Sequence, residues 1–352
     1  MTPRLPSDLL DRPAQESSRL LALSYLDQID RAHRRLRDSD DREALHDFRV
    51  GLRRLRSCVR AYRRQLKGSM TGKMRVQLRE LTRATNLNRD TEVQLAWLQQ
   101  QAPRIEAEDT HGFFWFTGML EGRKLASHDP AIAQAGRHYM KAAVRLRRRL
   151  AVLRIEIRNN LARKPPTFGQ VTGELIRHQI AQVRQELTRV GGVNDIEEAH
   201  RARIAVKRLR YLLEPVARSN RRARALISRL KAVQDLLGEH HDMHVISEAL
   251  ASARAGLAGG ETEAVTRLHR GLGTLERLAS EQAVAAFERF HSLFGGESAE
   301  RVLTRAEEIG SSLRLRPPER ADSVPPPTPA SVVNQDAAAT AEGRVVHSAQ
   351  PV

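Results

Sequence analysis

The sequence has few of the residues that build β-sheets, disulfide frameworks or membrane spans. Its 352 residues include a single cysteine, Cys58, so no intramolecular disulfide can form and thiolate metal clusters are excluded. Aromatic residues number only 14 (8 Phe, 4 Tyr and 2 Trp), whereas the helix formers Ala, Leu, Arg, Glu and Gln dominate. No apolar run has the length of a signal peptide or a transmembrane helix. The sequence therefore predicts an all-α, soluble and cytoplasmic protein.

Negative charge is also in short supply. The chain has 59 Lys and Arg against 42 Asp and Glu, which gives a formal net charge of +17. Such a surplus favours an anionic partner, and nucleic acid, an anionic membrane surface, an acidic protein and a phosphate polymer all fit it. Charge alone does not choose among these four.

Proline and glycine mark where the chain is divided. Residues 1–14 contain three prolines and predict a flexible leader. From there to residue 316 apolar residues recur at helical steps. This pattern predicts one helical domain over 15–316, with halves 15–164 and 167–316. The Pro-, Ala- and Ser-rich residues 317–352 predict a disordered tail. Breaks between helices are expected at Pro103, Asp129-Pro130, 164–166, Gly191-Gly192, Pro215, Gly259-Gly260 and Gly295-Gly296.

Two pairs of segments resemble each other across the two halves. LHDFRVGLRRLRS (45–57) aligns with AHRARIAVKRLRY (199–211) at an offset of 154. LRELTRATNLNRDTEV (78–93) then aligns with LKAVQDLLGEHHDMHV (230–245), placing Asp90 on Asp242. Two blocks in the same order at nearly the same spacing predict an internal duplication. With only two copies, the expected architecture is a pair of subdomains and not a solenoid.

Each copy of the first block predicts a helix with basic residues along one side. At 100° and 1.5 Å per residue, these residues span an arc of about 80° and about 15 Å of axis, beside an apolar arc. Like charges at this spacing repel each other, and partial burial raises the cost, so a polyanion lying along them is the expected reason for the pattern. We call them the first stripe (His46, Arg49, Arg53 and Arg56) and the second stripe (His200, Arg203, Lys207 and Arg210).

The segments LHDFRVGLRRLRS and AHRARIAVKRLRYLLEP, followed by LNRDTEV and LLGEHHDMHV, resemble the conserved histidine α-helical domain (CHAD) family. The resemblance covers roughly residues 16–312. It implies two four-helix subdomains related by a pseudo-twofold axis, around a basic central groove that binds inorganic polyphosphate. The implied contacts are the residues of both stripes. One departure is His241, which stands where the first half has Arg89.

Other charged residues complete the candidate site. Arg60, Arg89 and Lys231 are further candidate polyphosphate contacts, although Arg60 also fits a solvated face. Asp90 and Asp242 are expected to give structural support, either by capping a new helix or by holding a stripe arginine. A histidine beside phosphates is stabilised in its charged form, so binding should strengthen as the pH falls toward about 6.

Residues for catalysis or metal binding are not assembled in the sequence. There is neither a GxxxxGK phosphate loop nor a Gly-x-Ser-x-Gly elbow. Residues 261–265 lack the lysine of the Glu-x-Glu-x-Lys motif found in a hydrolase domain that is sometimes fused to CHAD proteins. The cluster of His240, His241 and His244 has no counterpart in the first half, so we favour surface or groove histidines over a metal site. We expect no enzyme activity, cofactor or bound metal.

The predicted function is therefore non-catalytic binding of inorganic polyphosphate, and association with polyphosphate granules and their proteins is a further hypothesis. A nucleic-acid-binding basic protein is the alternative. It is disfavoured because aromatic residues for base stacking are scarce and are not interleaved with the stripes. The aromatic segment 113–116 is interpreted as bundle core, with a partner-docking patch as the alternative.

Overall fold

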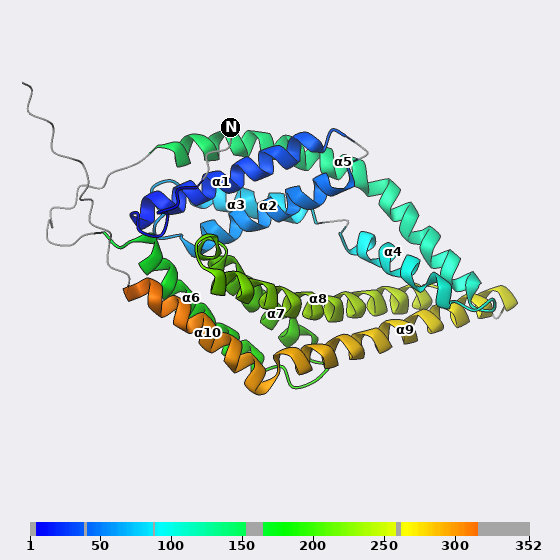
Figure 1. Ribbon diagram of the computed structural model, residues 1–352. Helices are drawn as coiled ribbons and strands as arrows, with labels where there is room; N and C mark the ends of the chain where they lie inside the picture. The colour runs from blue at the N-terminus through cyan, green and yellow to red at the C-terminus, as the bar shows by residue number, and fades with distance from the viewer. Residues whose placement is uncertain (1–4, 39–40, 87–88, 153–164, 258–261, 316–352) are drawn as a thin grey trace, which may run out of the picture. The chain divides into compact units, whose positions relative to one another are not determined.

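The computed structural model describes residues 5–38, 41–86, 89–152, 165–257 and 262–315. Regular secondary structure in these ranges is helical, which confirms the all-α prediction (Figure 1). Residues 1–318 form one compact unit. The second unit, residues 319–352, lies outside the described ranges, as does the segment 317–352 for which a disordered tail was predicted. None of the described helices is both long and apolar enough to cross a membrane.

Helices follow one another with short connections in both halves. The first half contains α1 (Ala14–Arg35), α2 (Arg42–Ala61), α3 (Gly72–Ala84), α4 (Arg89–Gln101), the 3-10 helix η1 (Ala102–Arg104) and α5 (Thr110–Ala151). The second half contains α6 (Phe168–Leu187), α7 (Ile196–Leu213), the 3-10 helix η2 (Val216–Arg218), α8 (Arg221–Ala255), α9 (Glu263–Phe294) and α10 (Gly296–Leu315).

Most predicted breaks coincide with helix ends, and one is wrong. Gly191-Gly192, Pro215 and Gly295-Gly296 separate helices, and Gly296 has the positive φ of 48° that glycine tolerates. The predicted break at Asp129-Pro130 is wrong, because α5 is one helix of 42 residues. Both flanks of α5 are anchored, by α1 and α3 at one end and by α4 and α9 at the other. Gly259-Gly260 lies outside the described residues.

Helix packing follows the same order in the two halves. α1 packs against α2 as α6 packs against α7, and α2 packs against α3 as α7 packs against α8. α3 and α4 contact α5, whereas the single helix α8 contacts α9. The halves differ in which helix is interrupted, since α8 is continuous where the first half has α3 and α4. This order is what a duplication would produce, and the duplication itself stays a prediction from the sequence.

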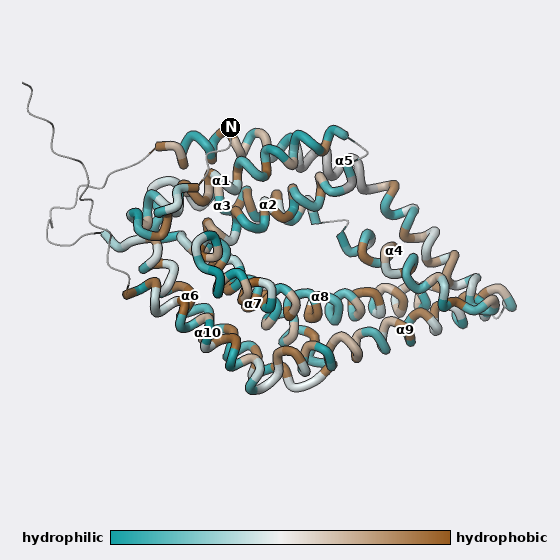
Figure 2. Tube along the Cα trace, viewed as in Figure 1, coloured by the Kyte–Doolittle hydropathy of each residue, from teal (hydrophilic) through white to brown (hydrophobic). Residues whose placement is uncertain are grey.

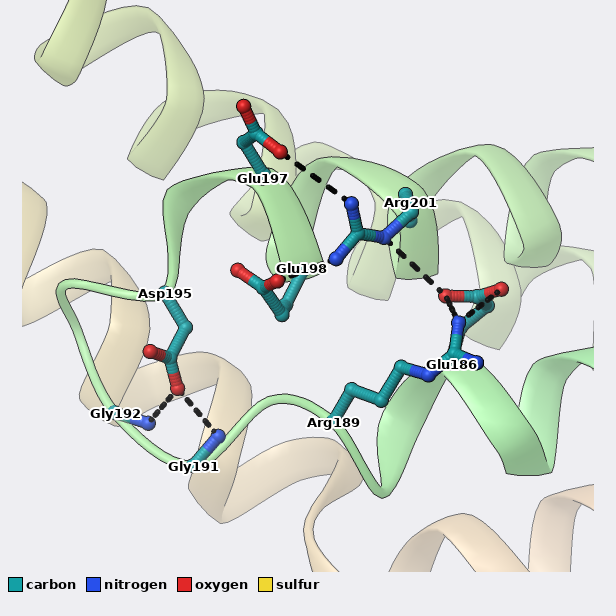
Figure 3. Close-up of polar contacts among 8 residues, drawn as sticks. All are labelled: Glu186, Arg189, Gly191, Gly192, Asp195, Glu197, Glu198 and Arg201. Atoms are coloured by element: carbon teal, nitrogen blue, oxygen red, sulfur yellow. Dashed lines mark hydrogen bonds and ion pairs between the residues drawn. The ribbon is translucent and has the colours of Figure 1, made fainter.

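The two stripe helices have well-defined starts. At α2, the Asp41 carboxylate accepts a hydrogen bond from the Ala44 backbone N–H at 3.0 Å. Before α7, Asp195 accepts from the backbone N–H groups of Gly191 and Gly192, at 2.8 and 2.9 Å, and so folds the double-glycine loop (Figure 3). The Asp41 contact caps the start of α2, and the Asp195 contacts shape the loop before α7.

The apolar arcs predicted beside the stripes form part of the core. Along α2, Phe48, Leu52, Leu55 and Val59 are buried. Along α7, Ala199, Ala202, Val206, Leu209 and Leu213 are buried. Figure 2 shows apolar and polar residues alternating along the helices at helical spacing. Each fully buried leucine contributes about 1.5–3 kcal/mol, which holds the stripes beside the core despite their charge.

A second apolar cluster joins α4, the start of α5, and facing parts of α8 and α9. It contains Phe113 and Phe116, as predicted for the aromatic segment, whereas Phe114 is 66% exposed. Gly112 of α5 and Gly271 of α9 lie at the crossing of the two helices. A Cβ on Gly271 would come within 2.3 Å of the Asp109 carbonyl oxygen, so glycine allows this close approach.

The flexible leader predicted for residues 1–14 is wrong for residues 5–13. Leu9 and Leu10 are buried in the main core. The Leu10 carbonyl accepts a hydrogen bond from the Gly169 N–H at 2.7 Å, and Pro13 forms an isolated β-bridge with Thr167. The prediction of a flexible leader relied on the three prolines and gave no weight to the leucines. These leucines pack against the start of α6. The first helix then begins at Ala14.

Candidate anion-binding site

The two stripes meet because α2 and α7 pack against each other. Arg53 and Lys207, which occupy matched positions at the offset of 154, interact electrostatically, and Arg56 also acts on Lys207. Arg53 in addition donates a hydrogen bond to the Tyr211 hydroxyl of α7. The centres of both stripes therefore lie at one place in the fold.

The cations at this meeting point are partly withdrawn from water. Burial, followed by repulsion from Arg53, Arg203, Arg210 and Arg56, lowers the pKa of Lys207 to about 8. The pKa of Arg53 is lowered mainly by burial, with Arg89 and Arg49 adding to the effect. Because burial is the largest influence on both residues and neighbouring cations add to it, the charged forms are held at a cost that a bound anion would relieve.

Arg49 differs from its neighbours on the first stripe. It is only 6% exposed, and its guanidinium donates to both carboxylate oxygens of Glu92 at 2.6 and 2.9 Å. Its Nε donates to the Thr85 carbonyl at 2.6 Å. These bonds neutralise Arg49 and join α2 to α4. The geometry therefore supports a structural role for Arg49 and not the predicted ligand contact.

Arg210 is neutralised in a similar way on the second stripe. It donates to Glu214 at 3.1 Å and to Gln234 of α8 at 3.2 Å, and it lies over the Tyr211 ring at 4.6 Å. Glu214 also accepts from Arg54 of α2, again at 3.1 Å. Arg54, Arg210 and Glu214 line a cavity of about 500 Å³ that residues of α1, α2, α7 and α8 surround. Arg210 thus faces an internal carboxylate as well as its stripe.

Five predicted contacts are exposed, and Arg56 is one of them. His46, Arg60 and Arg89 all present exposed side chains. Arg89 has only a 3.5 Å contact with Glu92. Lys231 is exposed and forms an ion pair with Asp235 on the same helix at 2.6 Å. Because both side chains of this pair are exposed, the pair is weak and Lys231 can exchange Asp235 for another anion.

Comparison with known proteins bears on what these cations bind. The CHAD domain family model matches residues 21–251, well over half of the chain. The protein belongs to the CHAD domain family. Polyphosphate binding is a known property of this family. None of the curated proteins compared with the sequence matches it.

Two solved structures are similar to this CHAD domain in fold. The CHAD domain from the plant Ricinus communis shares 21% identity at a TM-score of 0.61, covering 83% of this chain and 95% of that one. PptA from Streptomyces chartreusis shares 14% identity at a TM-score of 0.58, covering 81% of this chain and 100% of that one. Both likenesses concern the arrangement of helices.

A histidine cluster adjoins the second stripe of the CHAD domain. The rings of His200 and His241 lie 4.6 Å apart, and those of His240 and His244 lie 4.5 Å apart. Burial is the main cause of the lowered pKa of His200, His240 and His241. Arg203 adds to it at His200 and His241, and His244 does so at His240. The Nδ1 atoms of these three rings and the Arg203 Nε are buried without a hydrogen-bond partner. Within the described residues no group of His, Cys, Asp and Glu could hold a metal ion.

The two matched aspartates differ in position. Asp90 lies in the first turn of α4, next to the helix start that was predicted for it. Asp242 lies in the middle of α8, so the prediction that it follows a helix break is wrong. Burial raises the pKa of Asp242, and Arg203 and Arg89 oppose this rise. This leaves the second expectation, that Asp242 holds a stripe arginine, as a prediction; Arg203 acts on Asp242 electrostatically.

Three residues of the site were missed from the sequence. Tyr211 accepts from Arg53, Arg208 of α7 interacts with Arg56 and Arg60, and Arg79 of α3 acts on Arg56. A signal for Arg79 was present, because the second aligned block places it on Lys231. The signal for Arg208 was its match to Arg54 in the first block.

Proposed function

We propose that this CHAD domain binds inorganic polyphosphate along the two stripes and does not catalyse a reaction on it. The observation that carries the proposal is the meeting of the stripes at Arg53 and Lys207, where cations are half-buried against one another. A phosphate chain supplies closely spaced negative charges along a line, as the stripes supply positive ones. Its oxygens would also accept from the unpartnered Arg203 Nε.

A narrow polyanion fits this site better than a nucleic acid duplex does. Lys207 and Arg53 lie beside the buried apolar arcs of α2 and α7, so their ligand must approach the helix seam closely. A duplex presents its phosphates on a wide cylinder and is bound mainly by exposed basic surfaces. We therefore expect the exposed arginines elsewhere on the domain to give at most weak, salt-sensitive binding of DNA.

The non-catalytic part of the proposal rests on the groups that surround Lys207. A lysine with a pKa of about 8 can act as a nucleophile or base. Here the residues with the largest effect on it are arginines, which do not transfer protons near neutral pH, and His200 interacts with it more weakly. We therefore expect the polyphosphate chain length to stay unchanged on prolonged incubation with the protein, as read on a gel. If the wild type shortens the polyphosphate chain and Lys207→Met does not, the protein catalyses cleavage and the non-catalytic proposal is wrong.

The test of binding uses charge reversal at the stripe centre. Labelled long-chain polyphosphate is titrated with the wild type and with Arg53→Glu/Lys207→Glu at about 150 mM salt. The control is Arg277→Glu/Arg301→Glu, which makes the same charge change at exposed positions of α9 and α10. We expect binding to be lost in the stripe variant only, with helicity retained by circular dichroism. Equal binding by both variants, or displacement of the label by duplex DNA at equal phosphate, would point to the outer surface instead.

We further propose that polyphosphate binding directs the protein to polyphosphate granules. A fluorescent fusion of the wild type should concentrate on granules in cells that store polyphosphate, and the stripe variant should stay diffuse. Granule association by the stripe variant would show that another surface, and hence a protein partner, directs the localisation.

A further inference from the structure

The cavity of about 500 Å³ beside Arg210 is formed by elements from both halves of the domain. The N-terminal segment, α1 and α2 contribute to its wall, and so do the end of α7, η2 and α8. Small-molecule sites have volumes of about 300–1,000 Å³ and mostly apolar walls with a few polar groups. The cavity has this size, and one part of its wall is apolar, formed by Leu5, Leu21, Pro215, Ala217 and Ile227.

The polar part of the wall contains a buried tyrosine, Tyr25 of α1. It is only 7% exposed, and none of the described residues forms a hydrogen bond with its hydroxyl. Glu214 and Arg54, which also line the cavity, act on this hydroxyl electrostatically. Burial is the main cause that raises the pKa of Tyr25, so the hydroxyl keeps its proton and can donate. Because buried polar groups almost always have a partner, the hydroxyl requires an acceptor inside the cavity.

Three arginines give the polar part of the wall a positive charge. Arg54 and Arg210 each donate to Glu214 at 3.1 Å, and Arg218 donates to the Leu5 carbonyl at 3.4 Å. The bond from Arg54 uses its Nε, and the bonds from Arg210 use its Nε and Nη1. As far as the described residues show, the Nη groups of Arg54 and the Nη2 of Arg210 therefore keep N–H donors for a ligand. Glu214 is the one carboxylate among the lining residues, so the three cations outweigh it.

We propose that this cavity binds a small organic anion with an apolar body, of the class of medium-chain or aromatic carboxylates. The ligand's carboxylate would accept from the Tyr25 hydroxyl and from the remaining N–H groups of Arg54 and Arg210. Its apolar body would lie against the apolar part of the wall and be removed from water. A cationic ligand is disfavoured, because both oxygens of Glu214 already accept from arginine.

This ligand class differs from the phosphate polymer of the proposed function, and the inference does not depend on that function. Arg210 is the one stripe residue among those that line the cavity. Polyphosphate is charged along its whole length, so it gains nothing from an apolar wall and would lose hydration there. A carboxylate with an apolar body uses both parts of the wall.

The first experiment measures decanoate binding to the full-length protein by isothermal titration calorimetry. Two comparison ligands separate the parts of the proposal, because decanol lacks the charge and inorganic phosphate lacks the apolar body. We expect decanoate to bind roughly tenfold more tightly than either. Equally tight binding of decanol would assign the ligand to exposed apolar side chains such as Leu125, and equally tight binding of phosphate would assign it to the basic surface. Either result would overturn the proposal.

A pair of tyrosine variants tests the hydrogen bond. Tyr25→Phe removes the hydroxyl from the cavity, and Tyr211→Phe is the matched control, because Tyr211 does not line it. We expect Tyr25→Phe to weaken decanoate binding about tenfold, since a hydrogen bond to a charged group is lost. Its melting temperature and its affinity for polyphosphate should equal those of the wild type. Tyr211→Phe should leave decanoate binding unchanged.

A pair of arginine variants tests the positive charge. Arg218→Gln removes a cation from the wall, whereas Arg222→Gln removes an exposed cation of α8 that does not line the cavity. We expect Arg218→Gln to weaken decanoate binding about threefold, because the charge of this exposed residue is partly screened by water and salt. Arg222→Gln should leave it unchanged. Equal weakening by both variants would indicate attraction to the basic surface as a whole and would contradict a defined site.

The outcomes separate this inference from the proposed function. Failure of the wild type to bind decanoate would overturn the inference and leave the polyphosphate proposal intact. Decanoate binding that Tyr25→Phe leaves unchanged would show that the ligand binds elsewhere. Equal losses of decanoate and polyphosphate affinity in Tyr25→Phe would show that the cavity belongs to the polyphosphate site, which would overturn the inference as well.

Discussion

Replacing Lys207 by methionine should stabilise the ligand-free protein, although it removes a charged residue from the proposed binding site. The pKa of Lys207 is about 8, against 10.5 for a lysine in water. At about 1.4 kcal/mol per pKa unit, this difference corresponds to about 3 kcal/mol of unfavourable free energy for the charged form. Partial exposure and screening by salt reduce the expected gain to about 1–2 kcal/mol. Methionine keeps the length and the apolar stem of the side chain.

The effect has a defined pH dependence. Because the folded-state pKa of Lys207 is lowered, the folded protein pays for the charge at every pH below about 8. That cost disappears as the pH rises from about 8 to the unfolded value of 10.5. The gain of Lys207→Met over the wild type should therefore be full at neutral pH. It should be nearly absent near the unfolded pKa.

The assay is thermal and urea unfolding of the wild type, Lys207→Met and Lys231→Met. Lys231 is the matched control, an exposed lysine paired with Asp235 at 2.6 Å. We expect the melting temperature to rise by about 2–3 °C in Lys207→Met, with little change in the control. Polyphosphate affinity should fall at least tenfold in Lys207→Met. A destabilised Lys207→Met, or an equal gain in Lys231→Met, would refute the reasoning that Lys207 is held at a cost.

Three further predictions concern two histidines near the second stripe, the Arg49–Glu92 ion pair and the close contact at Gly271. The pKa values of His200 and His241 are lowered in the free protein. Bound phosphate should raise them, so the two imidazoles take up protons on binding and the affinity for polyphosphate should increase from about pH 8 to 6. In the His200→Gln/His241→Gln variant, calorimetry should show an affinity for polyphosphate that does not change with pH. A pH dependence as steep as that of the wild type would mean that other groups take up the protons. Glu92→Ala leaves Arg49 buried and unpaired, and urea unfolding should show a loss of about 3–5 kcal/mol; a loss below about 1 kcal/mol would contradict the structural role of this pair. Gly271→Ala places a Cβ against backbone atoms and should cost about 1–3 kcal/mol by the same measurement, so a stability equal to that of the wild type would show that the helices can separate there.

Local periodicity was enough to predict the stripes and the apolar arcs beside them. Both depend only on spacing along one helix, so Leu52 and Leu209 were assigned to the buried side before their neighbours were known. The matched blocks favoured one shared groove but left open whether the stripes face each other. In the structure Arg53 and Lys207 interact electrostatically, and a shared groove stays a prediction.

Pairing between distant residues was beyond the reach of the sequence. The bond from Arg49 to Glu92 spans 43 residues and requires the position of α4 against α2. The pair of Arg210 and Glu214, by contrast, has the i, i+4 spacing that a sequence can reveal. Asp242 was misplaced because the matched break after α3 is absent from α8. One copy of a repeat can keep a helix whole where the other interrupts it.

The packing of residues 5–13 against the start of α6 has a consequence for how the chain can be divided. The break near residue 165 separates the halves in sequence, but Leu9 and Leu10 complete a core that also contains Phe168. α1 contacts α6 as well as α2, so each half contributes to the surface that closes the other. The boundary between the halves in sequence is therefore not a boundary in the packed core. The unit of cooperative unfolding is therefore the pair of halves, and a fragment cut at the repeat boundary would expose Phe168 or the two leucines to water.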